Sequence, residues 1–281
     1  MREDVIRRGR FRGSRDAGTA EFLSSMEADR FIADADLMVD IAHLLMLERQ
    51  GLVDRPGAGK LIAVLLDLVD EGIPESVFEH RFEDIHAGIE AFLVEKTGED
   101  VGGRLHMGRS RNDEVATCIR LRLREALICM MDGLLDVREV LAGIAKDHTA
   151  TIMPGFTHMQ HAQPTTLAHH LLGYEQALSR DSWRLSDAYN RVNLCPLGAA
   201  AFAGTGYRID REWTAKMLGF DGMLENTMDA VASRDFALEV LADCAVLMTT
   251  VSRLCEELVL WSSRFVRFAE LDDAHASTSS I

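Results

Sequence analysis

The strongest constraint on the fold is a pair of segments in which apolar residues recur in alternating steps of four and three. Such steps place side chains on one face of a helix, and over about three heptads they predict long helices that pack nearly parallel. The two series are Leu123, Leu127, Met130, Leu134, Val137, Leu141 and Ile144, and then Ala237, Leu241, Cys244, Met248, Val251, Cys255 and Leu258. The later helix carries a second stripe, Val240, Leu247, Leu254 and Trp261, and therefore needs more than one neighbour.

The rest of the chain also favours helix. A third long helix is predicted over 166–192, and shorter helices are predicted over 31–50, 61–70 and 83–96, with glycine and proline between them. No segment shows a convincing strand alternation. We therefore expect an all-α chain, with a small helical N-terminal domain over 1–112 and part of a long-helix bundle over 113–281. Asn112 or Asp113 is the expected N-cap of the first long helix.

Composition excludes several classes of function. The formal net charge of −15 argues against a general nucleic-acid binder. No run of 18 apolar residues predicts a membrane span, and the charged N-terminus does not resemble a secretory signal. The five cysteines are odd in number and include no C-x-x-C pair, which favours core residues in a reducing cytoplasm. We expect no nucleic-acid or membrane partner.

The segment GRLHMGRSRNDE, at 103–114, gathers three arginines in this acidic chain. At a helix N-terminus, free backbone N–H groups and guanidinium groups together favour a carboxylate ligand. The alternative is a solvated basic turn that pairs with the acidic surface, and charge alone does not choose between the two.

The segment MPGFTHMQHAQPTT, at 153–166, is predicted to be a polar loop between helices. His158 or His161, beside hydroxyl and amide groups, suits a general acid or base. The alternative is a pair of surface histidines. A metal site is a weaker interpretation, because His-x-x-His without a carboxylate or thiolate is a poor ligand set. The C-terminal ELDDAHASTSSI is typical of a flexible loop.

Five segments together carry a family resemblance. EDIHAGIEAFL, GRLHMGRSRNDEVAT, GFTHMQHAQPTT, NLCPLGAAAFAGTGY and NTMDAVASRDF resemble argininosuccinate lyase, a member of the fumarase/aspartase superfamily, in the expected order. The match runs from about Phe11 to the last residue. The resemblance implies reversible cleavage of argininosuccinate to arginine and fumarate, without metal or organic cofactor, in cytoplasmic arginine biosynthesis. It also implies a homotetramer whose active sites are shared between subunits.

The resemblance also implies roles for particular residues. Arg109 supports the substrate site structurally. The catalytic residues are Ser279, as a base on a flexible loop, and His158, as acid or charge partner. The substrate-binding residues are Ser110, Arg111, Asn112, Thr157, His86, Asp84 and Gln160, with Arg234 and Ser14 as weaker matches.

The sequence departs from the family at two places. The family's third signature reads Ser-Ser-x-Met-Pro-x-Lys-x-Asn-Pro, whereas this sequence ends at Ser279-Ser280-Ile281. We therefore expect an incomplete bundle that lacks the C-terminal domain. Either the chain is a fragment cut inside a mobile loop, which we favour, or its three long helices bury their apolar faces by association. The second departure is 198–201, Gly-Ala-Ala-Ala in place of Gly-Ser-Gly-Ala, which should affect the packing of a turn.

Two other functions remain as alternatives. One is a different fumarate-releasing lyase of the superfamily, against which the GRSRND segment argues. The other is a non-catalytic helical scaffold, which the missing third signature favours. Retention of the polar segments argues against a scaffold, because a structural protein has little use for buried arginine and histidine. A merely solvated GRSRND segment would be highly exposed.

Overall fold

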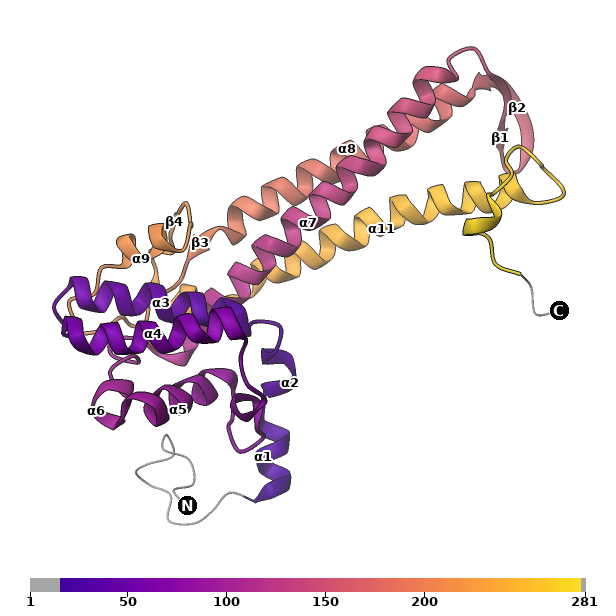
Figure 1. Cartoon of the computed structure of the whole chain (residues 1–281). Helices are drawn as coiled ribbons and strands as arrows, with labels where there is room; N and C mark the ends of the chain where they lie inside the picture. Colours follow the sequence, from indigo (N-terminus) through magenta and orange to yellow (C-terminus); the bar gives the residue numbers. More distant parts are fainter. Residues whose placement is uncertain (1–15, 279–281) are drawn as a thin grey trace. The chain divides into compact units, whose positions relative to one another are not determined.

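The computed structural model describes residues 16–278 (Figure 1). The predicted all-α class is confirmed, with two small pairs of strands added to the helices. Within 16–278, no helix combines the length and the hydropathy needed to cross a membrane. The elements are α1 (Ala17–Leu23), α2 (Met26–Asp29), α3 (Ala33–Arg49), α4 (Arg55–Glu71), η1 (Glu75–Phe78), α5 (Ile85–Thr97), α6 (Glu99–Gly102), α7 (Arg111–Asp147), β1 (Ile152–Thr157), β2 (Gln160–Thr166), α8 (Leu167–Val192), β3 (Leu194–Cys195), α9 (Arg211–Met217), β4 (Gly222–Met223), α10 (Thr227–Ala232), α11 (Asp235–Ser262) and η2 (Asp273–His275).

The predicted helices at 31–50, 83–96 and 166–192 correspond to α3, α5 and α8. The helix predicted from residue 61 begins earlier, at Arg55. Asp54 caps this helix, because its Oδ1 accepts the Gly57 N–H at 2.7 Å, and Pro56 suits the first turn. The capping residues therefore mark the true start of α4, whereas the spacing of apolar residues predicted a start that was too late.

The chain divides into two compact units. The first contains the described residues up to Ala126 together with Asn190–Arg234, and the second contains Leu127–Tyr189 and the described residues from Asp235. The divide along α7 therefore follows Ala126. The domain boundary predicted after Asn112 stays a prediction.

Helix α3 is the centre of the first unit. One of its faces, with Leu37, Leu44 and Leu47, packs against apolar residues of α4 and α5. Another face of α3, with Val39, packs against Cys118 of α7 and against apolar residues of the segment 195–220. A helix buried on most of its sides is apolar almost all round. Asp36 and Asp40 of α3 are buried and need partners inside the protein, whereas Asp34 and Arg49 are exposed.

The second unit contains three long helical stretches that lie side by side, from α7, α8 and α11 (Figure 1). Arg138 of α7 contacts Glu175 of α8, and Met130 of α7 contacts Cys244 of α11. On α11 the stripe with Val240, Leu247 and Trp261 is buried. The other predicted stripe is covered only in part: Cys244 contacts Met130, whereas Leu241 is 66% exposed and Met248 59% exposed.

A β-hairpin joins α7 to α8 in this unit, where a polar loop and no strand were predicted. That prediction was wrong. Strands β1 and β2 pair antiparallel with Thr157 opposite Gln160, so the turn between them has two residues. Most hairpin residues are exposed, so they show no alternation of apolar and polar types. The other pair, β3 and β4, is a parallel pair of two-residue strands in the first unit.

Candidate active site

The start of α7 is built by Ser110. Its N–H donates to Asp113 Oδ1 at 2.9 Å, and its carbonyl accepts the first helical bond from the Glu114 N–H at 3.2 Å. The Asn112 N–H lies 3.4 Å from the Ser110 Oγ. Ser110 is thus the N-cap, and Asp113 has the place that the acidic residue of a capping box takes. The predicted N-cap, Asn112 or Asp113, was wrong by two or three positions, because the serine precedes both.

Asp113 also joins the α7 start to a distant turn. Its Oδ2 accepts the N–H groups of Gly198 at 2.8 Å and Ala200 at 2.7 Å. The Asn112 Nδ2 donates to the Ala201 carbonyl at 2.9 Å. The turn departs from the family sequence at Ala200, whose φ of +53° lies in the left-handed region that favours glycine. The expected effect on this turn is therefore backbone strain.

Arg111 is held by an acidic partner. Its Nη1 donates to Asp84 Oδ2 at 2.7 Å, and the two side chains are only 24% and 14% exposed. Asp84 is the N-cap of α5, where its Oδ1 accepts the Ala87 N–H at 2.8 Å. Burial raises the pKa of Asp84, and the Arg111 guanidinium opposes that shift. Because Arg111 has further N–H groups, the pair orients a guanidinium beside a helix N-terminus that can take a carboxylate.

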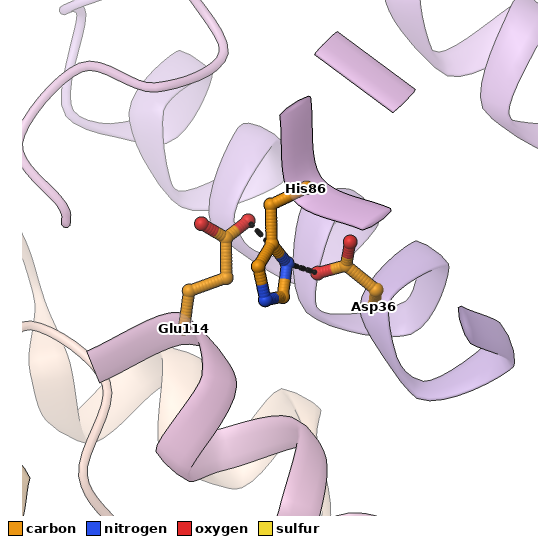
Figure 2. Close-up of side chains that lie close together, drawn as sticks. All are labelled: Asp36, His86 and Glu114. Atoms are coloured by element: carbon orange, nitrogen blue, oxygen red, sulfur yellow. Dashed lines mark ion pairs between the residues drawn. The ribbon is translucent and has the colours of Figure 1, made fainter. Parts of the chain in front are cut away.

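A buried cluster of five ionisable side chains lies behind these residues. We call Asp36 and Asp40 of α3, His86 of α5, Arg109 and Glu114 the buried charge cluster. Arg109 Nη2 contacts Asp40 Oδ1 at 2.5 Å and Glu114 Oε1 at 2.7 Å. His86 Nδ1 lies 2.9 Å from Asp36 Oδ1 and 3.7 Å from Glu114 Oε1 (Figure 2). Each of these five side chains is at most 3% exposed.

The cluster shifts the pKa of its members in different directions. Burial acts to lower the pKa of His86, but the neighbouring carboxyl groups, Asp36 above all, together outweigh it and raise that pKa to about 10. Burial raises the pKa of Asp40 to about 6 despite Arg109. Burial also raises the pKa of Glu114 well above its usual range, again against Arg109. His86 is therefore an imidazolium at neutral pH, paired with an ionised Asp36.

The cluster answers two questions left by the sequence. Arg109, whose side chain is 3% exposed, does not belong to a solvated turn, and its support of a substrate site stays a prediction. His86 points at Asp36 inside the protein, and its direct contact with substrate stays a prediction.

Within 16–278, one group of ligand-type atoms is compact enough for a metal ion. It consists of Asp36, His86 and Glu114, whose ligand atoms lie within 4.8 Å of one another. The group does not fit a cation as it stands. Arg109 already supplies a positive charge to Glu114 at 2.7 Å, and His86 is protonated in this setting and so has no free lone pair.

The second set of predicted residues lies on the hairpin. His158 and Met159 form its turn, with φ of +53° and +57°. Two successive positive φ values define a type I′ turn, which normally takes Asn-Gly. His158 is exposed at this turn, and Thr157 and Gln160, the last and first residues of the two strands, are exposed beside it. His158 therefore presents an exposed imidazole on a strained turn.

Three predicted residues remain. The Arg234 Nη1 donates to the carbonyls of Val231 at 3.1 Å and Ser233 at 2.7 Å, so it closes the end of α10. Ser14 and Ser279 lie outside the described residues. Sequence reasoning missed Asp36, Asp40 and Glu114. Its available signal was two aspartates four positions apart on an otherwise apolar helix.

The fold is that of a helical-bundle protein, and the α7 start is its candidate anion site. A sequence profile of a family described as lyase matches residues 9–281. The chain therefore belongs to this lyase family. The argininosuccinate lyases of Methanoculleus marisnigri and Methanosphaerula palustris are each 62% identical over 281 residues, which is 100% of this chain and 57% of each relative. The resemblance predicted from the five segments is confirmed, and the chain spans little more than half the length of these relatives.

Solved structures agree on the fold. EDDS lyase in complex with formate superposes with a TM-score of 0.84 at 32% identity, covering 96% of this chain and 54% of that one. The class II fumarase of Schistosoma mansoni gives a TM-score of 0.74 at 16% identity, covering 88% of this chain and 61% of that one, and supports the fold alone. The predicted fumarase/aspartase type of bundle is confirmed.

Proposed function

We propose that the chain provides the substrate-binding and proton-transfer residues of a carbon–nitrogen lyase that cleaves argininosuccinate to arginine and fumarate, in cytoplasmic arginine biosynthesis. The observation that carries the proposal is the α7 start. There Ser110 caps the helix and Asp84 orients Arg111, in a chain 62% identical to argininosuccinate lyases.

The chemistry needs such a site because the reaction removes a weakly acidic proton next to a carboxylate. The carbanion spreads its charge into that carboxylate, which becomes an aci-carboxylate dianion. Ser110, Arg111 and Asn112 are the proposed donors to its oxygens. Donors fixed before the reaction stabilise charge as it develops, and the Asp84 contact at 2.7 Å fixes the guanidinium in advance.

Proton transfer falls to other residues in this proposal. Ser279 removes the proton, and His158 acts as general acid or as charge partner during anti elimination. Thr157 and Gln160 flank His158 at the hairpin turn and bind substrate beside it. His86, Arg234 and Ser14 complete the proposed set, with no metal or organic cofactor.

The proposal includes a homotetramer with active sites shared between subunits. The partly covered stripe of α11, with Leu241 and Met248 largely exposed, supports burial against further helices. In mixed tetramers, His158→Ala and Arg111→Ala subunits leave some sites intact. Mixing the two inactive proteins should restore part of the activity. No recovery in verified mixed tetramers would contradict the shared sites.

The direct test adds argininosuccinate to the purified chain and follows fumarate by its ultraviolet absorbance. Fumarate release that is lost in Arg111→Ala supports the proposal. No release from the chain, while a chain extended by the remaining residues of a relative is active, assigns the loss to the region after Ile281. No release from either protein would reject the assignment.

One observation favours a second candidate, a lyase that releases fumarate from a different amine. EDDS lyase is 32% identical, and a variant of it was solved with bound fumarate. A panel of N-substituted aspartates in the same assay distinguishes the two. The third possibility, a non-catalytic scaffold, predicts a stable helical assembly with no fumarate release from any substrate.

A further inference from the structure

The buried charge cluster lies directly under the proposed carboxylate site. Arg109 precedes the N-cap Ser110, and Glu114 donates its N–H to the Ser110 carbonyl at 3.2 Å. His86 lies two residues after Asp84, which holds Arg111. Each residue that would touch a carboxylate is therefore joined through the backbone to a member of the cluster.

The cluster has one more carboxyl group than it has cations. Asp36 pairs with His86 at 2.9 Å and Asp40 with Arg109 at 2.5 Å. Glu114 shares Arg109 at 2.7 Å and is 3.7 Å from His86. Glu114 Oε2 has no hydrogen-bond partner among the described residues, and within hydrogen-bond distance Oε1 has only the shared ion pair with Arg109. An uncompensated charge in a dry interior is strongly unfavourable, so the cluster needs one proton.

We propose that Glu114 is a positioning residue, held as a neutral carboxylic acid, and that its ionisation loosens the α7 start that presents Ser110 and Arg111. The proposal rests on the proposed function only for the identity of the ligand, a substrate carboxylate. Burial, which raises the pKa of Glu114 well above its usual range, supports the same assignment.

Other titratable groups face the cluster, and their contributions to any pH dependence must be distinguished from that of Glu114. From α3 these are Asp36, Asp40 and His43, and from α5 they are Asp84, His86 and Glu90. From 106–118 they are His106, with Nδ1 3.8 Å from Glu114 Oε2, the arginines 109 and 111, and Cys118. A comparison of two proteins that share these groups cancels their contributions.

The experiment therefore compares the wild-type chain with Glu114→Gln, whose amide mimics the neutral acid. Hydrogen–deuterium exchange of peptides covering 109–116 is measured from pH 5 to 9 and corrected for intrinsic exchange. The ratio of wild-type to variant opening should grow by up to about tenfold per pH unit until Glu114 ionises in the closed state. Glu95→Gln, an exposed carboxyl on α5, is the control and should give a flat ratio.

A second reading is enzymatic. The KM for argininosuccinate should rise with pH more steeply in the wild type than in Glu114→Gln, with the kcat profiles parallel. A flat exchange ratio, or a Glu114→Gln chain that does not fold, overturns the positioning role. A growing ratio in a chain that releases no fumarate, with or without extension, counts against the proposed function alone. Fumarate release with a flat ratio counts against Glu114 alone.

Discussion

At the start of α7 the predicted site residues rest on paired buried charges, whereas at the β1–β2 turn they stand on an exposed hairpin. Ser110 and Arg111 are fixed by partners at hydrogen-bond distance inside their own unit. His158 sits in a strained turn and has no such support from its strands. The comparison indicates a division of labour. Under the proposed function, the first region is arranged in advance to bind an anion, and the second presents an exposed proton-transfer group.

The largest expected effect tests the chemical half of this comparison. His158→Ala should lower kcat for fumarate release by about 10²- to 10⁴-fold, the usual contribution of a general acid. Unfolding free energy should stay close to wild type, because the side chain is exposed. The control is His161→Ala, which removes an imidazole from the same hairpin and should keep most of the activity. An equal loss of kcat in the two variants would show that His158 has no special role in proton transfer.

The next effect tests the buried half. Arg109→Ala leaves the buried Asp40 carboxylate without its cation and should lower the free energy of unfolding by about 3–5 kcal/mol. Arg104→Ala is the matched control, since Arg104 is 42% exposed in its ion pair with Asp54, and should cost about 1 kcal/mol or less. Chemical denaturation measures both. If Arg109→Ala lowered the free energy of unfolding as little as Arg104→Ala does, water would have access to the buried charge cluster.

The pH dependence of stability sharpens the same contrast. The pKa of His86 is raised to about 10, so its pairing with Asp36 is fully present below about pH 6.5 and is lost as pH rises through 10. Denaturant unfolding should therefore show the first unit losing at least about 1 kcal/mol between pH 7 and 10. His86→Gln should flatten this slope. An unchanged slope in the variant would exclude His86 as its source.

The smallest effects concern backbone strain in each region. Met159→Gly at the hairpin turn and Ala200→Gly at the turn held by Asp113 place glycine at φ of +57° and +53°. Each should raise the melting temperature. The free energy of unfolding should rise by up to about 1 kcal/mol, once the greater entropy that glycine gives the unfolded chain is included. Ala203→Gly, in a neighbouring loop position outside the left-handed set, is the control and should not stabilise.

Long helices were predictable because burial repeats along them. The steps of four and three predicted α7 and α11, and the second stripe of α11 is its buried one. The hairpin was not predictable in this way, because most of its residues are exposed and no apolar face marks its strands. Prolines and glycine in 153–164 also suggested a loop, since they weaken strand propensity.

The candidate site could be proposed from the sequence where residue types suit one kind of chemistry. Arginine, serine and asparagine next to a helix start pointed to an anion, and the family resemblance named the residues. The buried charge cluster required the fold, because its members come from three elements far apart in sequence. Only the spacing of Asp36, Asp40 and His43, on one face of an apolar helix, hinted that charges were buried together.

The two bonds from Asp113 to Gly198 and Ala200 also set an order of events during synthesis. They join groups 85 and 87 positions apart, so the chain must grow well past α7 before the start of that helix is complete. Closing so long a segment has an entropic cost that the formation of a local helix does not have. On a ribosome, α7 can form early, but its start, which carries the proposed anion site, is complete only after α8 and the following turn have emerged.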